Sequence, residues 1–212
     1  MAIQRELAAR VIEHGATDHA QWIAGIDVGF EGAENRIARA AVVVLNRANL
    51  APVDYAIARV PVTFPYIPGL LAFREIPVVL KAMEQLATTP DVLIVDGQGR
   101  AHPRRLGIAA HLGVLLDLPT VGCAKSILCG AAKEPANKRG AWSALIDYGE
   151  IIGAALRTRV GVTPVYISVG HRVSLENARD LVLCCCKNYR LPETTRWAHR
   201  VAGGTKIEIR NS

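Results

Sequence analysis

A short apolar run that ends in an aspartate constrains this chain most. Residues 92–95 read Val-Leu-Ile-Val and lead directly into Asp96 and a Gly97-Gln98-Gly99 turn. Four apolar residues before a glycine-rich turn predict a buried strand. In open α/β sheets, ligands bind just outside the carboxyl ends of such strands, and glycines leave the backbone there accessible. Asp96 is therefore a candidate site residue, although an aspartate here also fits a simple cap of the following helix.

A second aspartate lies inside another predicted strand. Residues 23–30 are rich in β-forming types and carry Asp27 in their middle. A charge in a buried strand is costly unless it is paired or binds a cation. Two further β-like runs, 37–45 and 53–62, follow with turn residues between them, so the three runs predict an antiparallel meander.

The order of predicted elements resembles the ribonuclease H-like plan. The meander is followed by a helix over 70–86, the strand that ends at Asp96, a helix over 106–116 and a strand over 119–122. In that plan the first and fourth strands are parallel neighbours about 4.8 Å apart, which would place Asp27 beside Asp96. The predicted fold class is α/β, a ribonuclease H-like mixed sheet flanked by helices, in a single domain over residues 1–212.

The outer elements are predicted from shorter patterns. Residues 131–140 lack a clear pattern and predict a surface loop. The remaining expected elements are a helix over 4–14 ended by Gly15, strands over 151–159 and 165–169, a helix from the N-cap Ser174 to Cys186, and a short helix within 191–203.

Composition limits the partners and the compartment. Lys and Arg outnumber Asp and Glu by 25 to 19, and this net charge of +6 favours a polyanionic partner. We expect a cytoplasmic protein with no membrane partner, because no apolar run approaches the roughly 20 residues of a membrane span and no signal sequence precedes the first strand. The cysteines form no C-x-x-C pair, so Cys184, Cys185 and Cys186 are interpreted as small buried hydrophobic residues in a reducing compartment.

Neighbouring carboxylates predict a metal site. Asp27 and Asp96 would repel each other, and a divalent cation removes that repulsion. Oxygen ligands favour Mg²⁺, with Mn²⁺ as a substitute, and such an ion activates water and neutralises phosphate charge. Glu75, near the start of a predicted helix, fits either an outer base near this ion or a solvated first-turn acid. Lys125 also leaves a strand's carboxyl end, where it fits either a phosphate contact or an ordinary surface lysine.

A proline-bracketed loop lies between the meander and the next helix. Pro65 and Pro68 flank Tyr66 and Ile67 and hold them extended. The pair fits either a rigid aromatic tip or a plug at the edge of the core.

Six blocks of the chain together resemble the endonuclease V family of deoxyinosine-directed repair nucleases, and its bacterial members in particular. The blocks are IAGIDVGF, TFPYIPGLLAFRE, VDGQGRAHPRRLGIA, PTVGCAKS, VGHRVS and PETTRWAH, from about residue 22 to 200. By this resemblance the catalytic residues are Asp27, Glu75, Asp96, Lys125 and His199, with Asp27 and Asp96 as the metal ligands. The resemblance also implies that Tyr66 separates the strands as a wedge and that His102 lies beside the lesion pocket. The other candidate substrate-binding residues are Ile67, Gly69, Leu71, Gly97 and Gly99. His199 stands at a position that varies within the family, and His171 fits a structural role equally well.

The resemblance implies a reaction as well as a site. The substrate would be DNA that carries deaminated adenine, nicked by a monomeric enzyme at the second phosphodiester 3′ to the lesion to leave 3′-hydroxyl and 5′-phosphate ends. A base must leave the stack to be inspected, which costs a few kcal/mol, and a Tyr66 wedge would offset part of that cost. Hypoxanthine carries an O6 acceptor and lacks a 2-amino group, so backbone donors at Gly69, Gly97 and Gly99 are candidates to select it.

Two alternatives remain open at this point. An inosine-specific endoribonuclease would share these motifs, since recognition of a 2′-hydroxyl depends on loop geometry. A non-catalytic damage-binding protein could use the same pocket, but the retained carboxylates argue against it.

Overall fold

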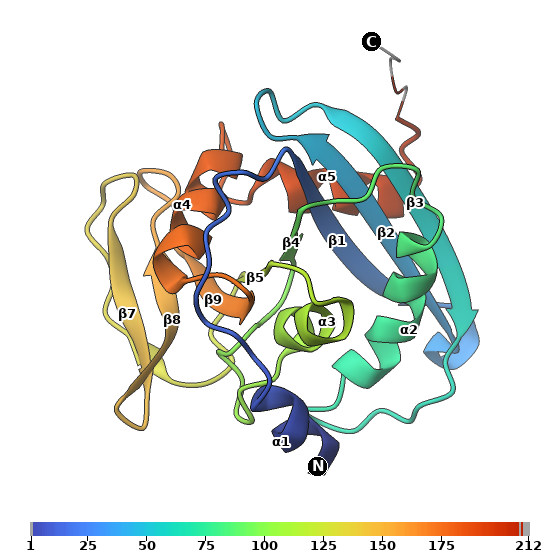
Figure 1. Cartoon of the computed structure of the whole chain (residues 1–212), viewed down its shortest axis with the longest axis horizontal. Coiled ribbons are helices and arrows are strands. Elements are labelled where there is room, and N and C mark those ends of the chain that lie inside the picture. Colours follow the sequence, from blue (N-terminus) through green and yellow to red (C-terminus); the bar gives the residue numbers. More distant parts are fainter. Residues whose placement is uncertain (1, 208, 210–212) are drawn as a thin grey trace.

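A mixed sheet forms the centre of the protein, with helices on both of its faces (Figure 1). The computed structural model describes residues 2–207 and 209, and in this part of the chain the sheet has nine strands in the order β3-β2-β1-β4-β5-β9-β8-β7-β6. The strands are β1 (Trp22–Glu31), β2 (Ile37–Asn46), β3 (Pro52–Pro61), β4 (Val92–Val95), β5 (Thr120–Ala124), β6 (Ala131–Ala132), β7 (Trp142–Asp147), β8 (Glu150–Leu156) and β9 (Val165–His171). The helices are α1 (Ala2–Ala8), η1 (Ala33–Asn35), α2 (Ala72–Met83), α3 (Ile108–Leu116), α4 (Leu175–Cys185) and α5 (Glu193–Ala202).

The pairing at the centre of the sheet confirms the predicted plan. Strands β1, β2 and β3 form an antiparallel meander. Strand β4 pairs with β1 in parallel, and Ile26 lies opposite Val95. Asp27 and Asp96 therefore follow paired residues on adjacent strands.

The two faces of the sheet carry different helices. Ala24 and Ile26 of β1 pack with α2 and α3, whereas Ile23 packs with α4 and α5 on the other face. Helix α5 crosses behind β1 and β2 in Figure 1. A Cβ at Gly25 would overlap the carbonyl oxygen of Thr194, so the missing side chain lets α5 lie directly against β1.

The amino-terminal helix is shorter than its apolar pattern predicts. Helix α1 ends at Ala8, so the expectation of a helix over 4–14 with Gly15 as its C-cap is wrong. The Gly15 carbonyl instead accepts a hydrogen bond from the Ser174 N–H at 3.1 Å. This contact ties an irregular segment to the start of α4, where Ser174 is the N-cap, as expected.

The strands at the β6–β7 end of the sheet differ most from the predicted elements. The expected loop over 131–140 contains the short strand β6, and β7 was not predicted at all. Strand β7 is held by its antiparallel pairing with β8, with Trp142 opposite Leu156, and such pairing is not visible in its own sequence.

Two further expectations concern single features. Cys185 and Cys186 are buried, but Cys184 is exposed, which corrects the interpretation of all three as buried residues. The reason is that consecutive helix positions point about 100° apart.

Within the described residues, none of the helices has the length and apolar character needed to cross a bilayer.

Candidate active site

Two aspartates and a lysine meet at the carboxyl edge of the central strands. Asp27 lies in the middle of β1 and Asp96 directly follows β4, and their side chains are only 17% and 20% exposed. Lys125 directly follows β5, and its ammonium donates a hydrogen bond to Asp96 Oδ2. His199 of α5 approaches from one face, with 3.6 Å between its Nδ1 and Asp27 Oδ2. The structure thus brings four of the five predicted catalytic residues together in two neighbouring pairs, Lys125 with Asp96 and His199 with Asp27.

The fifth, Glu75, joins them from the helix on the opposite face. It lies in the first turn of α2 and is partly buried, so it is not a solvated acid. Burial raises the pKa of Glu75 to about 7, and the negative charge of Asp96 adds to the shift, whereas Arg74 opposes it and Asp27 raises the pKa further. The negative charges of Asp96 and Asp27 thus both act on the Glu75 carboxyl group, and this edge of the sheet carries excess negative charge.

These carboxylates fit a hard divalent cation. In the part of the chain that the structure describes, no three His, Cys, Asp or Glu side chains converge closely enough to form a complete cage for an ion. Magnesium keeps several waters and is commonly bound through only one or two carboxylates. Asp27 and Asp96 therefore fit as two protein ligands, with Glu75 beside the water shell.

A cavity of about 300 Å³ opens beside the carboxylates. The predicted substrate residues that line it are Tyr66, Gly69, Leu71, Gly97 and His102, together with Glu75 and Asp96. Tyr66 is 66% exposed, and its ring centroid lies 5.9 Å from the Arg74 guanidinium carbon, so it stands at the rim and does not plug the core. Ile67 is also exposed but does not line the cavity.

His102 forms a buried wall of this cavity. Burial lowers the pKa of His102 to about 4, and the charge of Arg104 adds to the effect, so the ring is neutral near pH 7. Its Nδ1 accepts a hydrogen bond from the backbone N–H of Arg104 at 3.1 Å. The ring proton then sits on Nε2, and a hydrogen bond to the Gly69 backbone partly opposes the lowering of the pKa.

The three candidate glycines have different roles. Gly69 has a positive φ of 78°, and a side chain there would overlap the Arg104 guanidinium. Gly97 lines the cavity close to Ile108. Gly99 does not line the cavity, and its N–H donates to Ser168 Oγ at 2.8 Å. Of the three proposed backbone donors, Gly99 is therefore already used by the fold.

Sequence reasoning missed the residues that support the loop over 65–69. The Gly69 carbonyl accepts hydrogen bonds from Arg104 Nη2 at 2.6 Å and from Gln4 Nε2 at 3.0 Å. Gln4 is buried in α1, and its side-chain oxygen accepts a further bond from Arg104. No local signal could have indicated these contacts, because the partners are 35 to 100 residues apart in the chain.

Another supporting residue that the sequence did not reveal is Arg190. Its Nη2 donates to the carbonyls of Lys125 at 2.6 Å and Pro164 at 2.8 Å. These bonds hold the backbone from which the Lys125 side chain reaches Asp96.

His171 is structural and lies outside the site. It is buried, and its Nδ1 accepts a hydrogen bond from the Ile12 N–H at 3.2 Å. Its Nε2 lies 3.2 Å from Asp117 Oδ1. The ring therefore connects the amino-terminal segment to the end of α3.

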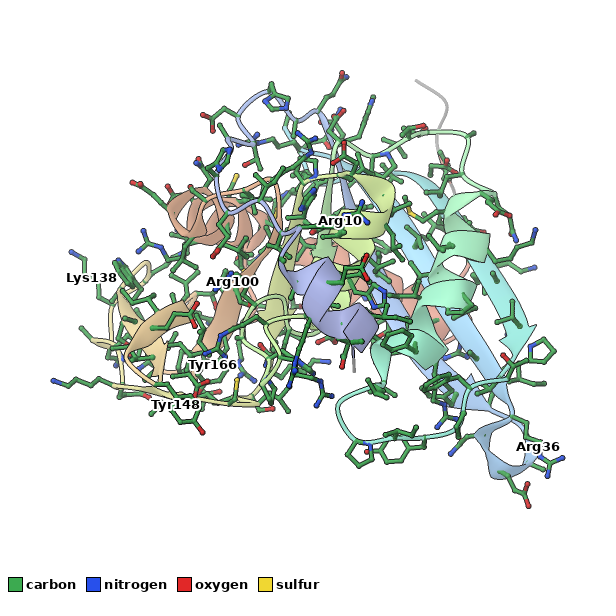
Figure 2. All side chains as sticks on the ribbon, turned by 60° about the horizontal axis from the view of Figure 1, so that its bottom comes forward. Arg10, Arg36, Arg100, Lys138, Tyr148 and Tyr166 are labelled. Carbon is green, nitrogen blue, oxygen red and sulfur yellow. The ribbon has the colours of Figure 1, made fainter. Side chains whose placement is uncertain are left out.

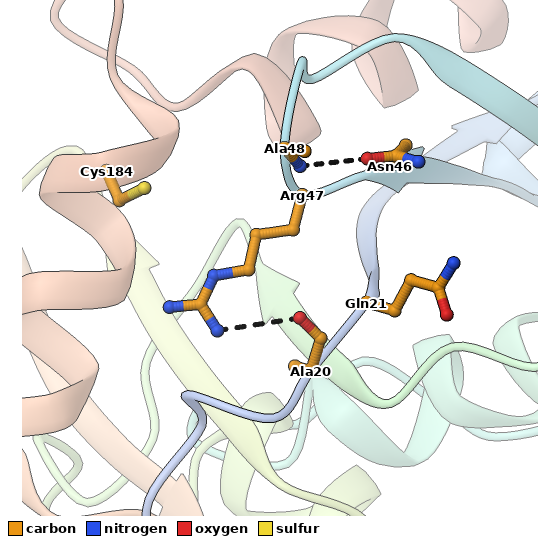
Figure 3. Close-up of a pocket in the computed structure, with 6 residues that line it drawn as sticks. All are labelled: Ala20, Gln21, Asn46, Arg47, Ala48 and Cys184. Atoms are coloured by element: carbon orange, nitrogen blue, oxygen red, sulfur yellow. Dashed lines mark hydrogen bonds between the residues drawn. The ribbon is translucent and has the colours of Figure 1, made fainter.

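A further cavity of about 470 Å³ lies where β1 begins and β2 ends, at the other end of these strands (Figure 3). It lies between that turn and Cys184 of α4. The Arg47 guanidinium in it donates to the backbone carbonyls of Thr17 and Ala20. Both bonds come from Nη1 and tie the segment before β1 to the end of β2, so we assign Arg47 a structural role.

The sequence profile of the Endonuclease V family matches residues 5–200. The chain belongs to the endonuclease V family. An endonuclease V from Trichormus variabilis is 56% identical over 203 residues, which cover 95% of this chain and 91% of that protein. The Endonuclease V structure from Streptomyces avermitilis has a TM-score of 0.91 and 45% identity, and the match covers 96% of this chain and 90% of that one.

A third relative was solved with a nucleic acid. Endonuclease V from Ciona intestinalis, in complex with a 23mer DNA that contains an inosine followed by a ribo-adenosine, has a TM-score of 0.84 and 28% identity. That match covers 96% of this chain and 93% of that one. The family is one of metal-dependent nucleases, so the chain is a nuclease, in agreement with the charge of the carboxylate edge.

Proposed function

We propose that this endonuclease V is a DNA repair enzyme that recognises deoxyinosine. With Mg²⁺, it hydrolyses the second phosphodiester bond 3′ to the lesion and leaves 3′-hydroxyl and 5′-phosphate ends. The observation that carries this proposal is that the cavity of about 300 Å³ and the carboxylate edge share Asp96 and Glu75. A base held in the cavity would place its own strand against the carboxylates. The complex of the Ciona intestinalis relative with inosine-containing DNA supports the substrate class.

Recognition follows from the shape of the cavity. Tyr66 at the rim would fill the gap left by a base that has rotated out of the stack. Gly69 and Gly97 keep the backbone open toward the base, where their N–H groups are candidate donors, and His102 forms part of the wall. Donors in this position suit hypoxanthine, which presents the O6 and N7 acceptors, better than adenine with its 6-amino group.

The hydrolytic step uses the carboxylates and the lysine. Magnesium held by Asp27 and Asp96 would supply positive charge at the phosphate and lower the pKa of a water. Glu75, which lies near both aspartates, is placed to take a proton from the attacking water, and His199 lies on the opposite side of Asp27. The Lys125 ammonium, next to Asp96, is placed to stabilise the charge that develops on the non-bridging phosphate oxygens.

The experiment that tests this function compares matched DNA and RNA oligonucleotides that carry one inosine. We expect Mg²⁺-dependent nicking of the DNA, with product ends that map to the second phosphodiester 3′ to inosine and carry a 5′-phosphate. Mn²⁺ should replace Mg²⁺. A faster cut in RNA would make the protein an inosine-specific endoribonuclease, and binding without any cut would make it a damage-binding protein.

We further propose that residues 1–212 act as one domain in a cytoplasmic monomer.

A further inference from the structure

A second cavity adjoins Asp96 and has a basic lining. Its volume is about 360 Å³. The cavity of about 300 Å³ lined by Tyr66 and His102 is called the base cavity below, and Asp96 is the one lining residue that the two cavities share. The base cavity is built largely by α2, α3 and the loops around them, whereas the second is built mostly by α5. Its lining residues are Asp96, Lys125, Leu191, Thr195, Arg196, His199 and Arg200. Asp96 therefore stands between two cavities, one on either side.

The cations of this second cavity differ in how they are paired. Lys125 pairs with Asp96, and Arg196 donates to Glu193 Oε1 at 2.6 Å. The Arg200 guanidinium carbon lies 5.0 Å from the ring centroid of Trp197 in the same helix. Among the residues that the structure describes, no carboxylate forms an ion pair with Arg200. Of the two arginines that line this cavity, Arg200 is thus the one whose charge is not paired with a carboxylate of the described residues, and this charge can meet a bound anion.

The other groups of the cavity favour a sugar-phosphate chain over a small anion. Leu191 is half-buried and offers an apolar surface. The Thr195 hydroxyl already donates to the Pro192 carbonyl at 3.1 Å, so it offers no free donor. Apolar contact for a sugar, combined with a guanidinium for a phosphate, is the pattern of backbone recognition in nucleic-acid interfaces.

We infer that this second cavity binds the substrate strand beyond the cut, with Arg200 contacting a backbone phosphate there. This inference rests on the proposed function, because it uses the direction of the strand. If the lesion base occupies the first cavity and the cut bond lies at Asp96 on its 3′ side, the strand that continues past Asp96 is the 3′ segment. The cavity would then hold the product that carries the 5′-phosphate, and Arg196 would shape its wall through its stacking on Tyr189.

The test measures how affinity depends on the length of each flank. Single-stranded inosine oligonucleotides are made with the 3′ flank shortened stepwise from about ten nucleotides to two, and a second series shortens the 5′ flank. Binding is titrated in EDTA, so that nothing is cut. We expect Arg200→Gln to weaken binding roughly 5-fold on long 3′ flanks and to have no effect on the shortest. On long 3′ flanks, the slope of log affinity against log salt concentration should become shallower by about 0.7.

Two control variants make the result specific. Lys138→Gln removes one positive charge from an exposed loop beside β7, at the left edge of Figure 2, and should leave both flank series unchanged. Arg200→Lys keeps the charge and should retain most of the affinity. Three outcomes would overturn the inference. Arg200→Gln could weaken binding equally at every flank length, it could leave binding unchanged, or its effect could depend on the 5′ flank. Failure of the proposed function is a different result, in which the unaltered protein does not nick inosine-containing DNA with Mg²⁺.

Discussion

Two glutamates in this protein lie among charges of opposite kinds. Glu75 lies beside Asp96 and Asp27, and its pKa is raised to about 7. Glu150, at the turn between β7 and β8, accepts hydrogen bonds from Arg100 and Arg105. Burial favours a higher pKa for Glu150, but the bond from Arg105 and the charge of Arg100 outweigh it and lower the pKa.

The surroundings of each glutamate extend this contrast. Near Glu150, Arg105 also pairs with Asp147 at 2.9 Å and Arg100 pairs with Glu13 at 2.6 Å, so positive and negative groups alternate. Figure 2 shows Arg100 and Tyr148 on the side of the molecule that carries β7 and β8. Each carboxylate in the ion-pair cluster around Glu150 pairs with an arginine, whereas among the described residues neither Asp27 nor Glu75 at the carboxylate edge forms an ion pair with a lysine or arginine. This difference separates a structural charge cluster from a binding site more clearly than the number of charged residues does.

The largest expected effect comes from removing a charge at the carboxylate edge. Asp96→Asn and Asp27→Asn should each lower Mg²⁺-dependent nicking roughly 100-fold or more, about 2.7 kcal/mol, since the amide keeps the shape but loses the charge that attracts the ion. Fold and inosine-DNA binding should persist. Single-turnover nicking and circular dichroism of each purified variant check this. Normal turnover by either variant would remove that aspartate from the metal site.

The second prediction concerns Glu75 in protein free of metal. Its folded pKa of about 7 exceeds the usual 4.5, so the folded state binds more protons between these values. Stability should therefore fall as the pH rises from about 4.5 to 7, and the full cost should be present above pH 7. Glu75→Gln should raise the free energy of unfolding by about 2 kcal/mol at pH 8 in EDTA. Urea titrations at pH 5 and pH 8 measure this, and a gain of the same size at both would show that charge is not the cause.

The third prediction tests the cation within the carboxylate edge. Lys125→Ala should slow single-turnover nicking roughly 10-fold, about 1.4 kcal/mol, with a smaller change in lesion affinity. Lys125→Arg should rescue the rate only partly, because the planar guanidinium is longer and differently aimed. A normal rate with weaker binding would instead make Lys125 a general backbone clamp.

The sequence predicted the aspartates better than their surroundings. Asp27 and Asp96 sit in or after strong apolar runs, and the order of the elements made these strands neighbours, which the β1–β4 register confirms. The approach of His199 to Asp27 depends on the close packing of α5 on Gly25, and no local pattern reports such a contact. For the same reason β7 was missed, because its stability comes from pairing with β8.

The smallest expected effect belongs to the ion-pair cluster and completes the comparison. Glu150→Gln should leave nicking unchanged and lower stability by less than about 1 kcal/mol, because the pairs of Glu150 with Arg100 and Arg105 are partly exposed. The sign is opposite to that of Glu75→Gln, since the lowered pKa of Glu150 means that its charge stabilises the fold. This stabilisation should be lost as the pH falls through its folded pKa and should weaken in 1 M salt. Urea titrations at pH 8 in low and high salt measure it, and a stabilising Glu150→Gln would mean that the two clusters do not differ in kind.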